Sequence, residues 1–253
     1  MPGPLLPTIE RAMACDLRDY VDAYRRFAPN AGATWTGVAG GVAAFTGPDS
    51  PLTTVKGAGP NLSARDLGAI EAFFRGHGAA TATIEMAPWI TDDTARALAE
   101  SGYHVADHED VVVSGAQRTE PGLPVEDIAI EAWPAVVRRC FELVEGSVVT
   151  DLFDASARLP GCRLYGVRDT TGWIACAGTV PYDPVVIFGN DGTRPEARGR
   201  GAQRALIDAR LGALPAGCVA VAEVAPGSGS ERNYLRSGFA IAYTRTHFTR
   251  TLN

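Results

Sequence analysis

Two segments of this chain repeat one short pattern, and this repeat limits the folds that the chain can adopt. The letters IEMAP (84–88) precede a helical pattern that ends in SGY (101–103), and AEVAP (222–226) precede one that ends in SGF (237–239). The offsets are 138 residues for the first pair and 136 for the second. A helical segment with matching apolar spacing precedes each copy. We therefore interpret the chain as two copies of one fold.

Composition excludes several classes of protein. A chain of 253 residues forms one large domain or two small ones, and the repeat favours two. Hydrophobic residues make up 46% and charged residues 21%, as in soluble globular proteins rather than disordered ones. The net charge of -6 provides no basic field, so neither a nucleic-acid nor a membrane partner is expected.

The cysteines and histidines do not form metal-binding motifs. Five cysteines are scattered without a CxxC pair, which predicts free thiols in a reducing cytoplasm and no metal. His104 and His108 are four residues apart in a stretch that reads as a strand, where that spacing does not form a ligand pair. The first residues lack the features of a signal peptide. The uncharged run 27–48 contains Pro29 and many glycines, so a loop and hairpin are expected rather than a membrane span.

Periodicity predicts a mixed α/β chain. Ser63 and Asp66 have the spacing of a capping box, and residues 34–57 contain two short β-type runs. Hairpin-connected strands precede the α/β units, so neither a TIM barrel nor a doubly wound sheet is expected. The predicted helices are 8–27, 63–74, 91–100, 134–144, 149–158, 201–211 and 231–237. The predicted strands, besides the runs in 34–57, are 80–86, 103–113, 163–168, 173–180, 185–189, 219–224 and 239–249.

The segment from Gly192 to Leu211 concentrates positive charge at the start of a predicted helix. Five arginines against two acidic residues give it a charge of +3 in a chain of -6. Gly199 and Gly201 allow backbone to approach a ligand, and the first N–H groups of a helix have no partner within it. These features suit a phosphate or pyrophosphate. The alternative is a solvated basic turn. The five arginines are Arg194, Arg198, Arg200, Arg204 and Arg210.

In this context the chain resembles the GNAT superfamily of acyl-CoA-dependent N-acetyltransferases. Arg198, Gly201 and Gln203 occupy the positions of that family's Q/R-x-x-G-x-G/A signature, although Gln203 departs from the usual Gly or Ala. Tyr234 and Phe239 have the family's tyrosine-to-phenylalanine spacing. The clear resemblance covers residues 125–253, and residues 1–113 look like a diverged copy.

The resemblance implies an α/β (α+β) fold of two tandem GNAT-like domains, each a mixed, mostly antiparallel sheet flanked by helices. We expect a degenerate domain over 1–115 without a phosphate loop, a linker over 116–124, and a catalytic domain over 125–253. The first copy has PNLSARD (60–66) where the second has the Arg/Gly loop. Residues 1–120 hold 9 basic and 15 acidic residues, whereas residues 121–253 hold 14 of each.

The resemblance also implies a site for acetyl-CoA as acyl donor. An N–H near Gly192 or Thr193 would polarise the thioester carbonyl, and Tyr234 would be the general acid. Ser230 and Asn233 would hold the pantetheine amides, with simple N-capping as the alternative. Tyr234 could instead only pack on the cofactor. The pyrophosphate would lie on the backbone of Arg198, Gly199, Arg200, Gly201, Ala202 and Gln203.

A general base is harder to name. Glu223 ends a strand where a carboxylate could face the acceptor, but its repeat mate Glu85 suggests a structural position. Asp151 and Asp154 could bind a cationic amine or lie in solvent.

The predicted function is transfer of an acetyl group from acetyl-CoA to a primary amine of a small molecule, by direct attack in a ternary complex. The alternatives are a protein or peptide N-acetyltransferase and a non-catalytic CoA-binding module. P-loop and dinucleotide-binding motifs are missing from the sequence. A monomer or a homodimer is expected.

Overall fold

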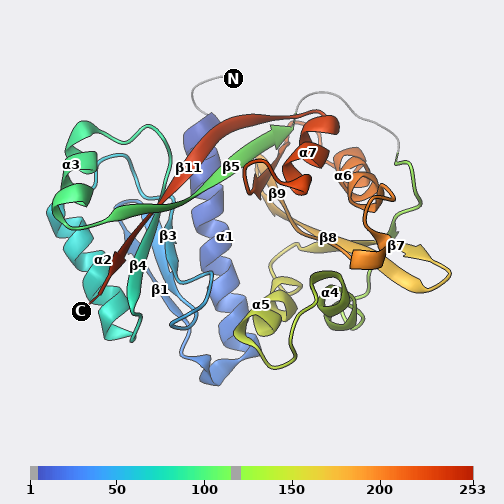
Figure 1. Ribbon diagram of the computed structural model, residues 1–253, viewed down its shortest axis with the longest axis horizontal. Helices are drawn as coiled ribbons and strands as arrows, with labels where there is room; N and C mark the ends of the chain where they lie inside the picture. Colours follow the sequence, from blue (N-terminus) through green and yellow to red (C-terminus); the bar gives the residue numbers. More distant parts are fainter. Residues whose placement is uncertain (1–4, 115–120, 253) are drawn as a thin grey trace. The chain divides into compact units, whose positions relative to one another are not determined.

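The computed structural model describes residues 5–114 and 121–252, which form two compact units (Figure 1). The first unit comprises Met1–Glu109 and Tyr243–Asn253, and the second comprises Asp110–Ala242. The chain therefore leaves the first unit, builds the second, and returns to the first with its last strand.

In the first unit the strands follow the order β1-β2-β3-β4-β11. β3 and β4 are parallel, and the other neighbouring strands in this unit are antiparallel. Its elements are α1 (Leu5–Phe27), the 3-10 turn η1 (Pro29–Ala31), β1 (Thr34–Val38), β2 (Gly41–Phe45), β3 (Thr54–Lys56), α2 (Ala64–Gly76), β4 (Thr81–Met86), α3 (Asp92–Glu100), the first part of β5 (His104–Ser114) and most of β11 (Phe239–Thr251).

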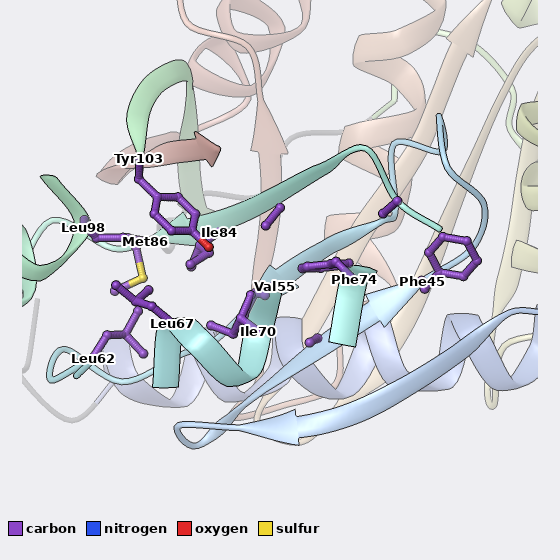
Figure 2. Close-up of a cluster of buried hydrophobic side chains, with 13 residues drawn as sticks. Phe45, Val55, Leu62, Leu67, Ile70, Phe74, Ile84, Met86, Leu98 and Tyr103 are labelled. Carbon is purple, nitrogen blue, oxygen red and sulfur yellow. The ribbon is translucent and has the colours of Figure 1, made fainter. Parts of the chain in front are cut away.

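One face of this sheet packs against α2 and α3. Alternate residues of each strand point to this face because side chains alternate along a strand. Figure 2 shows the resulting apolar cluster, in which side chains of α2 meet side chains of the strands. Its labelled members are Phe45, Val55, Leu62, Leu67, Ile70, Phe74, Ile84, Met86, Leu98 and Tyr103.

The opposite face of the same sheet carries a buried cluster of charges around Arg245. Its guanidinium is fully buried and lies 2.7 Å from Glu10 Oε1, on α1, and 3.5 Å from Oε2 of both Glu85 and Glu109. Lys56, the only lysine of the chain, places Nζ 3.3 Å from Glu85 Oε2. A buried charge without partners is costly, so these pairs tie β11 to α1, β4 and β5.

The second unit contains a six-stranded sheet in the order β5-β10-β9-β8-β7-β6. Figure 1 shows α6 and α7 on one face and α4 and α5 on the other, in agreement with the buried clusters. Its further elements are β6 (Glu126–Asp127), α4 (Trp133–Phe141), α5 (Val148–Ser156), β7 (Arg163–Asp169), β8 (Gly172–Tyr182), β9 (Val185–Thr193), the 3-10 turn η2 (Pro195–Ala197), α6 (Ala202–Gly212), β10 (Val219–Val224) and α7 (Gly229–Arg236).

The predicted repeat appears in both sheets as a parallel pair followed by an antiparallel strand. In the first unit β3 and β4 are parallel and β11 follows; in the second β9 and β10 are parallel and β5 follows. Thus β5, the last strand of the first copy, pairs with β10 of the second copy, and β11, the last strand of the second copy, pairs with β4 of the first. This exchange differs from the predicted consecutive domains 1–115 and 125–253. Part of the predicted linker 116–124, residues 116–120, lies outside the described residues.

The predicted helices and strands largely agree with the described elements, although α1 begins at Leu5 rather than 8 and α4 ends at Phe141 rather than 144. Residues 34–57 form three strands rather than two, β6 was not predicted, and β9 extends to Thr193 instead of ending at 189. The capping box of Ser63 and Asp66 is confirmed. In the part of the chain that the structure describes, no helix is long and apolar enough to cross a membrane.

We expect Arg245→Ala to destabilise the first unit strongly. The substitution would leave three carboxylates near one another beside Lys56 and His247, and removal of one partner from a buried ion pair costs ~3–5 kcal/mol. Urea denaturation would measure the change in the free energy of unfolding. Arg96→Ala is the control, because Arg96 forms an exposed pair with Asp93 and should change that free energy by no more than about 0.5 kcal/mol. Equal effects of the two variants would contradict this role for Arg245.

Candidate functional site

The parallel strands β9 and β10 of the second unit stop pairing before either strand ends. They pair from Val219 and Val185 as far as Val221 and Ile187, after which β9 continues to Thr193 and β10 to Val224. Ligands of open α/β sheets bind where neighbouring strands diverge at their carboxyl ends. A cavity of about 750 Å³ lies at this end of β9 and is lined by residues of β9, α4, the Arg/Gly loop, α6 and α7.

A bulge in β9 shapes the wall of this cavity. The register with β8 shifts between Cys176, which pairs with Gly192, and Gly178, which pairs with Gly189. Asn190 lies in the bulge in a left-handed conformation, with φ of 57°, and its Nδ2 donates to Ser156 Oγ at 3.1 Å. Because a bulge leaves one residue out of the ladder, backbone groups near Asp191 can turn toward the cavity.

The start of α6 opens into the same cavity. Gly199 and Gly201 have φ of 78° and 83°, and Gly201 is the N-cap residue of α6 without a side-chain cap. The N–H groups of the first turn therefore remain available to an anion. Arg198 and Arg204 line the cavity beside this turn.

The repeat provides an internal comparison for this helix start. In the first unit, α2 begins at a capping box in which Ser63 Oγ accepts from the Asp66 N–H, and Asp66 Oδ2 accepts from the Ser63 N–H at 2.9 Å. The Ser63 hydroxyl also donates to Asp66 Oδ2 at 2.6 Å, and this bond, followed by the one from the Ser63 N–H, lowers the pKa of Asp66, so a negative charge occupies the place where an anion would bind. The corresponding helix start of the first unit is therefore unsuited to a phosphate.

Gln203 bridges α6 and α7. Its Nε2 donates to Ser230 Oγ at 2.8 Å, and its Oε1 accepts from Asn233 Nδ2 at 2.8 Å. The structure thus brings together three predicted site residues and joins the two helices through them. The side chain of Gln203, which departs from the family signature, is accommodated by these bonds.

Two further arginines of the cavity were missed by sequence reasoning. Arg232 and Arg236, one turn apart on α7, line the cavity, and neither forms an ion pair with any described residue. Their i, i+4 spacing places both side chains on one side of α7, and this could be seen in the sequence. Only the packing of α7 beside α6 shows that this side faces the cavity. Cys140, Phe141 and Asp191 also line the cavity and had no signal in the sequence.

Nine of the predicted site residues line the cavity, and three do not. Arg200 lies elsewhere, with Nη1 at 3.2 Å from Asp169 Oδ2, and Tyr234 and Glu223 are also missing from the described lining. Glu223 is half-buried on β10, opposite Val111 of β5. The nine are Gly192, Thr193, Arg198, Gly199, Gly201, Ala202, Gln203, Ser230 and Asn233.

Tyr234 is buried behind the cavity rather than at its surface. Its hydroxyl donates to Asp191 Oδ2 at 2.8 Å, and Arg210 forms an ion pair with the same carboxylate. Burial, followed by the charge of Asp191, raises the pKa of Tyr234 well above its usual range. A phenol that holds its proton more tightly is a weaker acid. This geometry favours a role for Tyr234 in positioning Asp191, which does line the cavity.

The predicted acceptor residues lie on α5. Asp154 is buried, with Oδ2 at 3.6 Å from Arg138 Nη1, and burial raises its pKa. Asp151 is half-buried, and neither aspartate is among the described residues that line the cavity.

Glu85, Glu109 and His247 form a group of possible metal ligands in the first unit. Their ligating atoms all lie within 4.8 Å of one another. Both carboxylates already pair with Arg245, which has its Nη1 3.5 Å from each Oε2. A metal ion would have to share these oxygens with a buried cation, so the charge balance does not favour one.

Comparison with solved structures identifies the fold. A GCN5-related N-acetyltransferase from Kribbella flavida matches with a TM-score of 0.63 and 15% identity over 90% of this chain and 95% of that chain. A tandem GNAT protein from the clavulanic acid biosynthesis pathway matches with a TM-score of 0.62 and 18% identity over 93% and 88%.

A GCN5-related N-acetyltransferase from Sphaerobacter thermophilus matches with a TM-score of 0.55 and 15% identity, and the match spans 68% of this chain and 60% of that chain. No protein-family model matches the sequence, and no curated protein is significantly similar to it. The chain therefore has the predicted α/β fold of tandem GNAT proteins, in two GNAT-like parts.

We expect Tyr234→Phe to lower the free energy of unfolding by ~1.5–3 kcal/mol, since it removes a buried hydrogen bond to a charged group. Because the pKa of Tyr234 is raised in the folded state, its contribution to stability is complete below about pH 10 and lost as the pH rises further. Urea denaturation at several pH values would measure both effects. Tyr165→Phe, in the same unit, is the control and should change little. An unchanged free energy in Tyr234→Phe would contradict the role assigned to this hydroxyl.

Proposed function

We propose that the second unit binds acetyl-CoA in the cavity at the end of β9 and transfers the acetyl group to a primary amine of a small molecule. The observation that supports this most directly is the uncapped start of α6, which opens into the cavity beside arginines. The GNAT-like fold is consistent with acyl transfer.

The polyanionic end of the donor would lie at the Arg/Gly loop. The N–H groups that follow Arg198 would bind the pyrophosphate, and Arg204, Arg232 and Arg236 add positive charge around the same cavity. Arginine suits phosphate because its planar fork donates two parallel hydrogen bonds.

The thioester would lie beside Gly192 and Thr193. Gly192 packs closely on α4: a Cβ atom there would lie 2.5 Å from the Phe141 ring and 2.9 Å from Cys140 Cβ. The backbone of β9 consequently faces the cavity without a side chain at this point. An N–H group held here would stabilise the oxyanion that develops on the carbonyl, an effect worth ~10²–10³ in rate for one donor.

Transfer would proceed by direct attack. The neutral amine forms a C–N bond to the carbonyl carbon, the C–S bond breaks, and the CoA thiolate leaves while the nitrogen loses a proton. We assign Tyr234 to positioning Asp191 in the cavity wall, and the thiolate takes its proton from solvent or from the nitrogen. No covalent enzyme intermediate is required.

We expect acetyl-CoA to stabilise the protein against heat, by ~2.7 kcal/mol at about 100 times its dissociation constant. Arg232→Gln and Arg236→Gln should each weaken binding about tenfold, because each removes a charge-assisted hydrogen bond. Thermal shift titrations would measure this. Arg163→Gln is the control, since Arg163 lies in the same unit but outside the described lining and pairs with Asp127. No stabilisation of the unmodified protein would contradict donor binding.

We expect mass spectrometry to detect N-acetylated products when the protein is incubated with acetyl-CoA and a library of small amines. Gly192→Ala should lower kcat by about tenfold or more, because its Cβ displaces Phe141 and moves the oxyanion donor. Gly189→Ala is the matched control on the same strand, where a Cβ meets no atom within 4 Å.

Acetylated peptides in place of acetylated amines would favour a protein acetyltransferase. Donor binding without any product would favour a non-catalytic CoA-binding module.

A further inference from the structure

Two cysteines meet at the wall of the cavity. Cys176 on β8 is the cross-strand partner of Gly192 on β9, so its side chain points to the same face of the sheet as a side chain at 192 would. The Cβ position of Gly192 lies 2.9 Å from Cys140 Cβ on α4. Because Gly192 has no side chain, the Phe141 ring and Cys140 pack against the backbone here, on the side of the sheet where Cys176 lies. Both cysteines belong to one buried cluster.

The two thiols have different surroundings. Cys140 lines the cavity, whereas Cys176 is fully buried behind it and is not among the described lining residues. The neighbouring Cys176 thiol lowers the pKa of Cys140, and burial opposes this effect without cancelling it. Its hydrogen bond with Cys140, followed by burial, raises the pKa of Cys176 well above the usual range. The pair thus combines a more acidic thiol at the cavity with a less acidic thiol behind it.

We propose that Cys140 and Cys176 form an oxidisable dithiol site that reacts with small hydroperoxides entering through the cavity. The Cys140 thiolate attacks one peroxide oxygen, the O–O bond breaks, and a sulfenic acid and water form after proton transfer. The Cys176 thiol then attacks the sulfenic sulfur, the S–S bond forms, the S–O bond breaks, and a second water leaves. Two thiols are oxidised to one disulfide, and one hydrogen peroxide is reduced to two waters.

Cys218 provides a contrast within the same unit. It is more exposed than Cys140, but its Sγ lies 3.7 Å from Asp183 Oδ1. Burial, followed by the negative charge of Asp183, raises its pKa. If exposure alone decided the order, Cys218 would oxidise first. If the acidity of the thiol decides it, Cys140 oxidises first.

The test treats the reduced full-length protein with hydrogen peroxide, alkylates the remaining thiols and maps the peptides by mass spectrometry. We expect Cys140 and Cys176 to disappear together, at least ~10-fold faster than Cys218, into one disulfide that dithiothreitol reverses. In Cys176→Ser, Cys140 should proceed to sulfinic acid without the disulfide. Cys218→Ser, the matched control, should form the disulfide at the unmodified rate.

Two results would overturn the proposal: oxidation of Cys218 as fast as that of Cys140, or loss of the Cys140 thiol without a bond to Cys176. A further arm adds acetyl-CoA, which has no free thiol, and rests on the proposed function. Slower disulfide formation would support both the donor site and peroxide entry through it. An unchanged rate in a protein that binds acetyl-CoA would overturn that entry route. If the disulfide forms but the protein does not bind acetyl-CoA, the proposed function is wrong and the proposed dithiol site is still supported.

Discussion

The divergence of β9 and β10 is the constraint on which the rest of the site depends. Parallel strands that stayed paired would leave no opening between them, but these two share hydrogen bonds only as far as Ile187 and Val221. Beyond this point β9 bulges, while the other edge of β10 stays paired with β5 as far as Val224. The cavity, the uncapped start of α6 and the arginines of α7 lie beside the end of β9 that has left β10.

The two copies of the fold differ at the start of the helix that connects the two strands of each parallel pair. At the start of α2, Ser63 and Asp66 satisfy the backbone N–H groups and add a negative charge. At the start of α6, Gly201 leaves them without a side-chain cap. Both helices have the same place in the repeat, so a few side chains suffice to remove an anion site while the fold is retained. The first unit instead uses its interior to bury the ion pairs of Arg245.

Buried polar groups have comparable structural roles in the two units. Arg245 joins β11 to α1 and β4, and Arg210 joins α6 to Asp191 on β9. Each arginine is fully buried and paired with carboxylates, which keeps the cost of its burial low only while the partners stay in place. In the second unit this arrangement also involves Tyr234, so its hydroxyl is committed to Asp191. Tyr234, which the sequence predicts as a catalytic residue, therefore lies behind the cavity wall.

The sequence by itself determined the helices and strands, the repeat, the capping box of α2 and the glycine-rich helix start at Gly201. These depend on residues close together in the chain, where periodicity and capping act directly. Only the tertiary structure decided the exchange of β5 and β11, the burial of Tyr234, the presence of Arg232 and Arg236 in the cavity, and the place of Cys140 and Cys176 in one buried cluster. Each of these depends on pairing between distant segments, and pairing is set by the packing of whole faces rather than by local pattern.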